Sequence, residues 1–290
     1  MAGAPRPVVL TIALVLTLTL PVRGGKAPPA PALTLAPAAM ETFLLKARVV
    51  QSRDAGSGVT GSRRVTLSDG SLTHDAHVQV VDIQRTSFQA GKASEFNFKD
   101  SYRFNIAGYR LATLLGIRVP MSVQRTYDGN RASFTWWVDD VAMDESARLK
   151  ASFRGDPERT TRQMLVMRAF DELIQNVDRN KGNLLWTKDW TLWLIDHTRA
   201  FRLNKQLLKR DDLTRIDRTL LARLRDLDPK RVREVVGDSL TGDEVEAVLA
   251  RRTALVRHYD ERIALAGEAA VLFDLEEKLD SVSVEPSPRP

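Results

Sequence analysis

The chain of 290 residues contains no cysteine and only four histidines. Without cysteine, disulfides, thiolate metal sites, iron–sulfur clusters and a cysteine nucleophile are excluded. Only His74 and His77 lie close together in the sequence. They fall in a segment with strand-like alternation, whereas the paired histidines of a zinc protease lie on a helix. We therefore expect solvated or hydrogen-bonded histidines rather than metal ligands.

The composition is that of a folded protein, with 43% hydrophobic and 28% charged residues. Lys and Arg outnumber Asp and Glu by 43 to 37, which gives a formal net charge of +6. A positive charge suits an anionic partner such as a nucleotide or a membrane surface. The basic residues are spread along the chain and form no nucleic-acid motif, so we expect no sequence-specific nucleic-acid binding.

The two ends of the chain differ in composition from the rest. Residues 1–25 place Arg6 before an apolar run from Val8 to Leu20, which has the length of a signal peptide and is short for a membrane span. The Pro/Ala-rich residues 26–39 predict an extended linker, and residues 276–290 predict a disordered tail. We expect the protein to be exported, periplasmic or secreted, or to associate with a membrane through an N-terminal anchor.

Residues 40–140 are rich in strand patterns. Asp128-Gly129 lies between two such runs and is typical of a two-residue hairpin turn. Residues 99–116 carry a helical apolar stripe that ends at Gly116. This half is therefore expected to mix strands with a helix.

Residues 141–275 are mainly helix-patterned, and from about residue 203 nearly all of them are. One helix is expected to begin at Pro157, and Thr241 with Glu244 three residues later predicts a capping box at the start of another. The sequence as a whole predicts an α+β fold with a strand-rich first half and a helical second half.

Polar residues concentrate in one insertion in the helical half, FDELIQNVDRNKGNLLWTKDWTLWLIDHTRAF. Asp178 and Asn183 fall in a loop, and Asp196 follows the apolar run WTLWLI after a turn, so a hairpin would bring the three side chains together. Such an oxygen-only set suits Mg²⁺ or Mn²⁺ on phosphates and does not suit zinc. The spacing Asp-x-x-x-x-Asn matches the catalytic loop of phosphoryl-transfer kinases.

A second motif, GSGVTG, places Gly56, Gly58 and Gly61 in the pattern G-x-G-x-x-G. A dinucleotide-binding fingerprint would open a helix. Here the strand-like RRVTLS follows, as in a loop that covers phosphates between two strands. A flexible surface turn is the alternative interpretation.

With both motifs, the chain resembles the atypical kinases of the superfamily that includes the phosphatidylinositol 3- and 4-kinases, the HipA kinases and the secretory-pathway casein kinases. NVDRNKGNLL resembles their catalytic loop, and LIDHTRAF resembles their metal-binding segment. The resemblance implies a two-lobed protein-kinase-like fold, with an N-lobe at 40–140 and a C-lobe at 141–275, and ATP with Mg²⁺ or Mn²⁺ as cofactors. It implies that Asp178 is catalytic with Arg179 in support, and it assigns the metal to two residues, Asn183 and Asp196.

The resemblance also places the nucleotide pocket. WWVDD falls where the hinge contacts adenine, which makes Trp137 and Val138 pocket walls, with plain core as the alternative for the tryptophans. The phosphate-binding Lys and its partner Glu correspond to Gln79 and Asn105, so both charges are missing. Losing one such donor costs roughly 10²- to 10³-fold in rate. We expect a nearby cation to replace the Lys, from the set Arg63, Arg64, Lys99 and Arg103.

The implied activity is transfer of a phosphoryl group from ATP to a hydroxyl of a protein or a lipid. The missing charges leave open a kinase-like module that binds a nucleotide or a protein partner without turnover. Two other interpretations of the insertion remain. One is a calcium loop beginning at Asp178, although Asn183 and Asp189 stand where Gly and Glu are required. The other is a turn in which Asp178 and Asn183 satisfy backbone groups.

Overall fold

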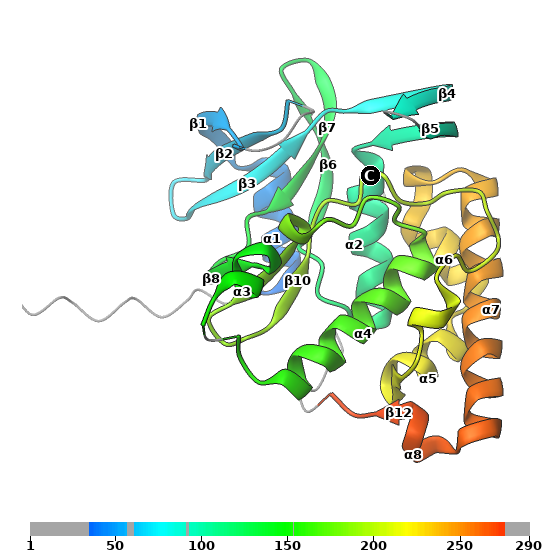
Figure 1. The fold of residues 1–290 in the computed structure, drawn as a ribbon. Helices are drawn as coiled ribbons and strands as arrows, with labels where there is room; N and C mark the ends of the chain where they lie inside the picture. The colour runs from blue at the N-terminus through cyan, green and yellow to red at the C-terminus, as the bar shows by residue number, and fades with distance from the viewer. Residues whose placement is uncertain (1–34, 57–60, 91–92, 153, 276–290) are drawn as a thin grey trace, which may run out of the picture. The chain divides into compact units, whose positions relative to one another are not determined.

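The computed structural model describes residues 35–275 apart from 57–60, 91–92 and 153 (Figure 1). The predicted signal peptide or anchor and the predicted tail lie outside the described residues. Of the helices in the described part, none is long and apolar enough to cross a membrane. Helix α1 (Pro37–Lys46) begins inside the segment predicted as extended linker. A proline at the start of a helix has a fixed φ that already suits the helix, so the prediction of a linker to residue 39 is wrong at that end.

The strand-rich half is built on a five-stranded antiparallel sheet with the order β1-β2-β3-β7-β6 (Figure 1). Its strands are β1 (Arg48–Asp54), β2 (Arg63–Ser68), β3 (Thr73–Gln79), β6 (Ser122–Tyr127) and β7 (Asn130–Trp136). The turn between β6 and β7 is formed by Asp128 and Gly129, both with positive φ, as the sequence predicts.

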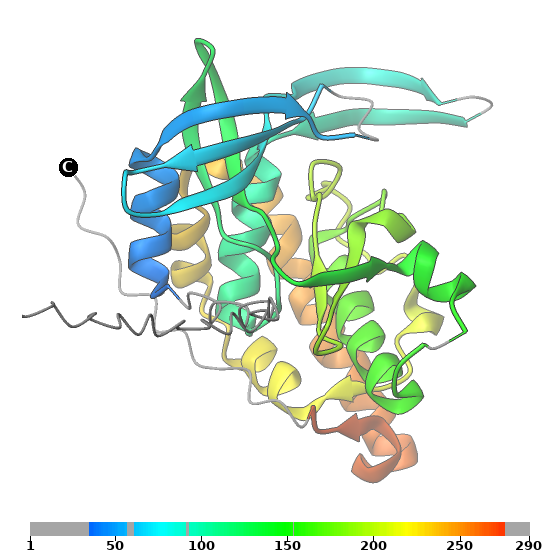
Figure 2. The same ribbon diagram turned by 90° about the vertical axis from the view of Figure 1, so that its left-hand side faces the viewer.

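One face of this sheet is apolar and the other is polar. Helix α1 lies against the apolar face (Figure 2). There Phe43 and Leu44 of α1 pack against a buried cluster from the strands that includes Val65, Leu67, Ala76, Val78 and Phe134. Because side chains alternate along a strand, the other face carries polar side chains from β2 and β3: Arg64, Thr66, Asp75, His77 and Gln79. The sheet therefore presents hydrogen-bonding groups on the side that α1 leaves uncovered.

A long hairpin, β4 (Asp82–Ala90) with β5 (Ala93–Ser101), extends away from the sheet and leads into α2 (Arg103–Leu115) (Figure 2). Helix α2 ends at Gly116 with a φ of 69°, as predicted. Its predicted start at residue 99 is wrong, because residues 99–101 pair with β4. Lys99 therefore lies on a strand and not on the helix that carries Asn105.

The second half is mainly helical. Its helices are α3 (Glu145–Lys150), α4 (Pro157–Ile174), α5 (Arg218–Asp226), α6 (Pro229–Val236), α7 (Gly242–Ala266) and α8 (Glu268–Val271). Helix α4 begins at Pro157, and Thr241 with Glu244 forms the predicted capping box of α7. Residues 203–215 are instead mostly irregular, with one 3₁₀ turn at Arg210–Asp212.

Two short strand pairings complete this half. The strands β8 (Val141–Asp144), β9 (Leu184–Thr187) and β10 (Leu192–Leu194) form an antiparallel sheet, and β11 (Ile216–Asp217) pairs in parallel with β12 (Leu272–Phe273). One apolar cluster joins α2, α4 and α7 to the β9–β10 hairpin, and its fully buried rings are Phe104, Phe170, Trp186, Phe201 and Tyr259. Helix α2 thus contributes to the core of the helical half.

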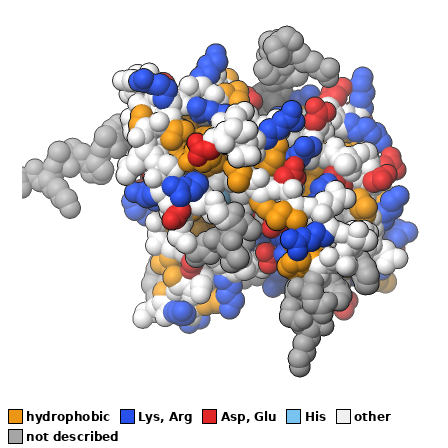
Figure 3. Space-filling model, turned by 90° about the horizontal axis from the view of Figure 1, so that it is seen from above, with side chains coloured by type: hydrophobic (Ala, Val, Ile, Leu, Met, Phe, Trp, Pro, Cys, Tyr) orange, Lys and Arg blue, Asp and Glu red, His pale blue; other side chains and the backbone are white. Residues whose placement is uncertain are grey.

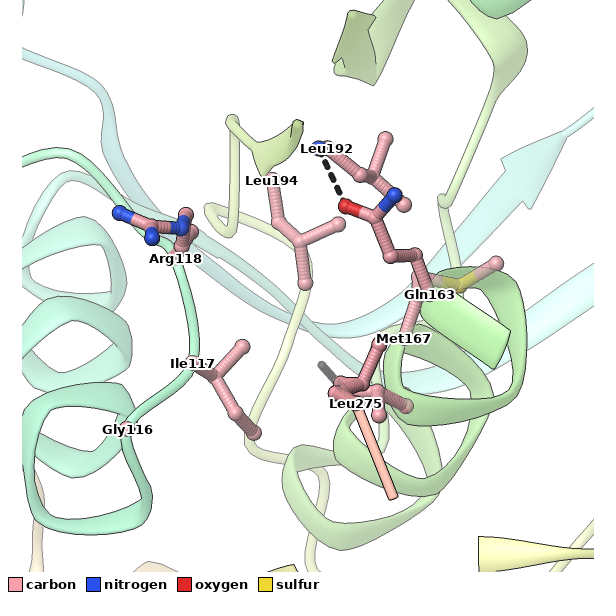
Figure 4. Close-up of a pocket in the computed structure, with 9 residues that line it drawn as sticks. Gly116, Ile117, Arg118, Gln163, Met167, Leu192, Leu194 and Leu275 are labelled. Carbon is pink, nitrogen blue, oxygen red and sulfur yellow. Dashed lines mark hydrogen bonds between the residues drawn. The ribbon is translucent and has the colours of Figure 1, made fainter. Parts of the chain in front are cut away.

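A small apolar cavity of about 40 Å³ lies between the end of α2, α4 and β10 (Figure 4). Ile117, Met167 and Leu194 point into it, and Gln163 accepts a hydrogen bond from the main-chain N–H of Leu192 at 2.7 Å. This space suits at most a few water molecules. A nucleotide site must therefore be sought elsewhere, around the polar insertion.

Candidate active site

The predicted catalytic loop begins where α4 ends. Gln175 caps α4 in the left-handed conformation, with a φ of 48°. The side-chain oxygen of Asn176 accepts a hydrogen bond from the Asp178 N–H at 3.1 Å, and that of Asn180 accepts one from the Gly182 N–H at 2.9 Å. The local turns are thus made by the two asparagines. The Asp178 carboxylate is exposed and accepts no hydrogen bond from the described residues.

Arg179 fastens this loop from the inside. Its guanidinium donates two hydrogen bonds of 2.9 Å to the Asp171 carboxylate on α4. It also donates to the main-chain oxygens of Ile195 at 2.6 Å and Asn183 at 3.4 Å. The Arg179 side chain is only 8% exposed. One buried cation therefore connects α4, the loop and the strand end that precedes Asp196.

We expect Arg179→Met to lower the free energy of unfolding by about 3–5 kcal/mol, because it leaves the Asp171 carboxylate, only 12% exposed, without its partner. Urea denaturation followed by tryptophan fluorescence measures this change. Arg225→Met is the matched control, since Arg225 pairs with Asp260 on the surface with 46% of its side chain exposed, and the expected loss is below about 1 kcal/mol. Equal losses in the two variants would contradict the fastening role of Arg179.

Asp196 lies next to Asn183 in the fold. The N–H of Ile195 donates to the main-chain oxygen of Asn183 at 3.1 Å. Asp196 itself has a φ of 55°, a left-handed conformation that aspartate tolerates better than most residues. Its Oδ1 accepts hydrogen bonds from the hydroxyl and N–H of Thr198, at 3.1 and 3.4 Å, while the Asn183 amide lies 3.5 Å from the main-chain oxygen of Asp178. The structure thus brings Asp178, Asn183 and Asp196 together.

Gln79 and Asn105 also meet. The Asn105 amide donates to Gln79 Oε1 at 3.0 Å and to the Ser133 hydroxyl at 3.4 Å, and its oxygen accepts from the His197 N–H at 2.8 Å. Both amide side chains are buried. Helix α2 is therefore linked to β3 and to the segment after Asp196 by neutral hydrogen bonds, at the place where the resemblance puts a Lys–Glu ion pair.

His197 lies between α2 and α4. A Cβ atom on Gly108 of α2 would be 3.1 Å from the His197 ring, so the absence of a side chain at Gly108 allows this close approach. The ring also packs edge-on against Phe170, with centroids 6.0 Å apart. Burial, with a smaller contribution from the Arg179 cation, holds the pKa of His197 well below its usual value. The imidazole is therefore neutral at pH 7 and serves as a packing group.

Asp100 is a site residue that the sequence did not reveal. It lies on β5, is 7% exposed, and its carboxylate is hydrogen-bonded to the side chain of Thr198. Burial raises the pKa of Asp100, and the negative charges of Asp196 and Asp178 raise it further, against the lowering effects of Thr198 and Arg199. In the sequence, an Asp just before a helix suggests a helix cap. No local pattern therefore identifies Asp100 as a residue of the site.

The glycine motif forms the connection between β1 and β2. Gly56 and Gly61 have φ values of 102° and 66°, which favour glycine, and Gly58 lies outside the described residues. The N–H of Ala55 donates to the main-chain oxygen of Ser62 at 3.1 Å, which closes the hairpin. The motif therefore joins two antiparallel strands and does not open a helix, as the sequence predicts.

Trp137 and Val138 lie in the segment that joins β7 to β8. The N–H of Trp137 donates to the main-chain oxygen of Asp75 on β3 at 3.1 Å, and its ring lies 3.9 Å from the Arg64 guanidinium. Val138 is buried. Trp136, by contrast, packs against the apolar cluster under α1. Trp137 and Val138 thus lie at the junction of the two halves, while Trp136 belongs to the core.

The four cations proposed to replace the missing Lys all have carboxylate partners. The pairs are Arg63 with Asp54, Arg64 with Asp75, Lys99 with Glu244, and Arg103 with Asp82. Lys99 contacts α7 and is thereby directed to the helical half. Arg64 is the candidate on the polar face of the sheet, directly opposite His77 in the β2–β3 register. Each of the four cations expected to replace the Lys is therefore already engaged in an ion pair with a carboxylate.

A divalent cation fits the oxygen donors around Asp196. Across the described ranges, no three His, Cys, Asp or Glu side chains lie close enough to hold a metal ion by themselves. Mg²⁺ is usually bound by one or two carboxylates together with substrate phosphates and water. Asp196 and the amide oxygen of Asn183 meet that requirement, and a nucleotide would complete the coordination.

The two structural interpretations of the insertion fit less well. In a calcium loop Asp189 would turn back toward Asp178. Instead, the Asp189 carboxylate accepts hydrogen bonds from Thr187 and Thr191 in the β9–β10 turn. In the turn interpretation Asp178 and Asn183 satisfy backbone groups. The Asn183 amide does donate to the main-chain oxygen of Asp178 at 3.5 Å, but the local turns are made by Asn176 and Asn180.

The fold is shared with solved kinase structures. A hydra Fam20 structure with sugar superposes with a TM-score of 0.62 at 14% identity, over 81% of this chain and 91% of that one. A Golgi casein kinase with Mn and ADP bound superposes with a TM-score of 0.59 at 13% identity, over 81% and 78%. No protein-family model and no curated protein sequence matches the chain. These structures confirm the predicted α+β, two-lobed protein-kinase-like fold.

On the face of the molecule seen in Figure 3, the Lys and Arg side chains of the described residues lie among acidic and apolar side chains. They do not gather into one basic surface there. The groups that could attract an anion are therefore best sought at the site itself.

Proposed function

We propose that the chain is an atypical kinase that transfers a phosphoryl group from ATP to a hydroxyl acceptor with Mg²⁺ or Mn²⁺. The observation that carries this proposal is the gathering of Asp178, Asn183 and Asp196 by the buried Arg179. These are the residue types that kinases use to orient the acceptor and to hold the metal. The Mn and ADP bound to the Golgi casein kinase of similar fold support the choice of cofactors.

Each residue has a distinct task in this proposal. Asn183 Oδ1 and the Asp196 carboxylate would hold the divalent cation, which would supply positive charge to the phosphates. The hydrogen bonds from Thr198 keep Asp196 in place. The exposed Asp178 carboxylate orients the acceptor hydroxyl and accepts its proton. Phosphoryl transfer depends more on positioning than on a strong base, so an exposed carboxylate suffices.

We propose a protein or lipid hydroxyl as the acceptor, with a sugar hydroxyl as a third class suggested by the sugar in the hydra structure. The signal-peptide or anchor pattern of residues 1–25 and the Golgi origin of the second structural neighbour support a site of action in the export pathway or at a membrane. Labelled ATP offered with a casein, phosphoinositide vesicles and a free glycan distinguishes the three classes by the product that takes up label.

Binding of the nucleotide is tested by thermal denaturation. We expect Mg-ATP at a hundred times its Kd to stabilise the wild-type chain by about 2.7 kcal/mol, or roughly 5–10 °C in Tm. Asp196→Asn should abolish the shift, because it removes a carboxylate from the metal. Asp260→Asn, which removes one charge from exposed α7, should keep the shift. An unchanged Tm of the wild type with Mg-ATP or Mn-ATP refutes nucleotide binding.

A second candidate function is binding of a nucleotide without turnover. The neutral hydrogen bond between Gln79 and Asn105 favours it, because the position of the phosphate-binding Lys in the kinases that the chain resembles carries an uncharged amide here. In that case Mg-ATP raises the Tm, no acceptor takes up label, and Asp178→Asn changes neither result.

A further inference from the structure

Residues 137–140 connect β7 to β8, and two neighbouring aspartates in this connecting segment contact opposite halves of the chain. The Asp139 carboxylate lies 3.0 Å from Nε2 of His74 on β3. Asp140 pairs with Lys188 of the β9–β10 turn at 2.6 Å, and its main-chain oxygen accepts from the Lys188 N–H at 2.9 Å. The connecting segment is therefore held on one side by a histidine and on the other by a lysine.

Both ring nitrogens of His74 face oxygen atoms that act as acceptors. Nδ1 lies 2.7 Å from the main-chain oxygen of Asp75, and Nε2 lies 3.1 and 3.0 Å from the two carboxylate oxygens of Asp139. A neutral imidazole carries a proton on one nitrogen only, whereas the imidazolium donates from both. The two contacts are therefore hydrogen bonds at the same time only when His74 carries its second proton.

The ring of His74 lies in a setting that stabilises a cation. It stacks on Trp136, with the ring centroids 3.6 Å apart and the planes inclined by 18°, and the face of an indole attracts a cation. The His74 side chain is only 14% exposed, and the apolar Leu67 stands opposite it in the β2–β3 register. Because little water reaches the ring, Asp139 and the indole are the groups that stabilise its charge.

The neighbouring carboxylate on β3 has other partners. Asp75 accepts a hydrogen bond from Arg64 at 2.6 Å and lies 3.5 Å from the guanidinium of Arg53. Among the charged side chains of the described residues, Asp139 is therefore the one that contacts the His74 ring.

His258 on α7 shows the opposite arrangement. Its Nε2 donates to the main-chain oxygen of Leu213 at 2.8 Å, and its Nδ1 accepts from the Arg210 guanidinium at 2.9 Å. One ring proton satisfies both contacts, and a second would break the one with Arg210. Burial lowers the pKa of His77, His197 and His258. The contacts of His74 thus favour the imidazolium, whereas those of His258 favour the neutral ring.

We propose that the second proton of His74 fastens the connecting segment to the strand-rich half, as a pH-dependent clamp formed by the contacts of His74 with Asp75 and Asp139. The clamp is complete at acidic pH. As the pH rises and the proton leaves, one ring nitrogen turns a lone pair toward an oxygen, so one of the two contacts is lost. The lysine on the other side stays charged over the range in which histidine titrates. Only the attachment to the strand-rich half therefore depends on pH.

Counting ring protons tests the inference directly. Long-range ¹H–¹⁵N spectra of the full chain with ¹⁵N-labelled histidine distinguish singly from doubly protonated rings, and the signal missing from His74→Gln assigns His74. At about pH 6 we expect two ring protons on His74 and one on His258. A single ring proton on His74 at this pH overturns the inference, and the wild-type spectrum decides this whatever the variants do.

Two neighbouring substitutions identify the partner of His74. In Asp139→Asn, His74 should carry one ring proton at the same pH, because the amide of asparagine can itself donate to Nε2. Asp140→Asn removes the same charge one residue further along and should leave two protons on His74. Equal proton counts in the two variants would contradict the role of Asp139.

The hold on the connecting segment is measured by hydrogen exchange. The N–H of Trp137 donates to the main-chain oxygen of Asp75, which also faces His74 Nδ1. We expect the protection factor of this N–H to fall about two- to fivefold between about pH 6 and pH 8, because Asp139 is 63% exposed and the contact is that of a surface pair. Asp139→Asn should show no such fall. A constant protection factor in the wild type overturns the clamp.

One further consequence rests on the proposed function. If Trp137 and Val138 wall a nucleotide pocket, the Kd for Mg-ADP should rise about two- to fivefold more between about pH 6 and pH 8 in the wild type than in Asp139→Asn. The same pH dependence in both chains overturns the link between the clamp and the pocket. A chain that binds no nucleotide at either pH refutes the proposed function, while two ring protons on His74 still support the clamp.

Discussion

Asp178→Asn is expected to lower the rate of phosphoryl transfer about 10²- to 10⁴-fold, which is the usual contribution of a positioned proton acceptor. The Asp178 carboxylate is exposed and accepts no hydrogen bond from the described residues, so it is available to an acceptor hydroxyl. Its replacement keeps the side-chain shape and leaves Arg179 with its partners. The thermal shift with Mg-ATP should therefore persist while label uptake falls.

Asp128→Asn is a suitable control for this experiment. Asp128 is exposed in the β6–β7 turn with a φ of 48°, and asparagine is equally favoured in such a turn. Its transfer rate should equal that of the wild type. If Asp178→Asn were as active as this control, Asp178 would not be the residue that orients the acceptor.

The part of the site that the sequence predicts is the part that is local in the chain. Asp178 and Asn183 belong to one loop, and a single hairpin returns the chain to Asp196, so a pattern over a short stretch is sufficient. The hydrogen bond from Ile195 to Asn183 closes that geometry. The contact between Arg179 and Asp171 already lies outside the pattern, because it depends on how α4 ends.

The rest of the site depends on contacts that are distant in the sequence. Asp100 reaches Thr198 only because β5 is an edge of a hairpin that passes beside the segment after Asp196, and no local pattern records this. The same hairpin explains the error at Lys99, which pairs with β4 and contacts Glu244. Gln79 and Asn105 were located by resemblance, since two uncharged amides carry no signal of their own.

The neutral link between Gln79 and Asn105 has consequences for both stability and activity. The two amides are buried and satisfy one another, His197 and Ser133. A single charge placed there would be buried without a partner, which is strongly destabilising, whereas a charge pair compensates much of that cost. The effects of substitutions at the two positions on stability are therefore expected to be strongly coupled. In this chain both positions carry uncharged amides.

Restoring the charges together should raise the rate of phosphoryl transfer. We expect Gln79→Lys and Asn105→Glu each to destabilise the chain alone and the double variant to recover much of the loss, with a coupling free energy of about 0.5–3 kcal/mol in a double-mutant cycle. The double variant should transfer phosphate roughly 10²- to 10³-fold faster, because one preorganised donor to the phosphates is regained. Urea denaturation and label uptake measure the two effects.

The rate of the double variant also distinguishes the two candidate functions. A folded double variant with no increase in rate, in which Mg-ATP still binds, would instead assign this chain to binding without turnover.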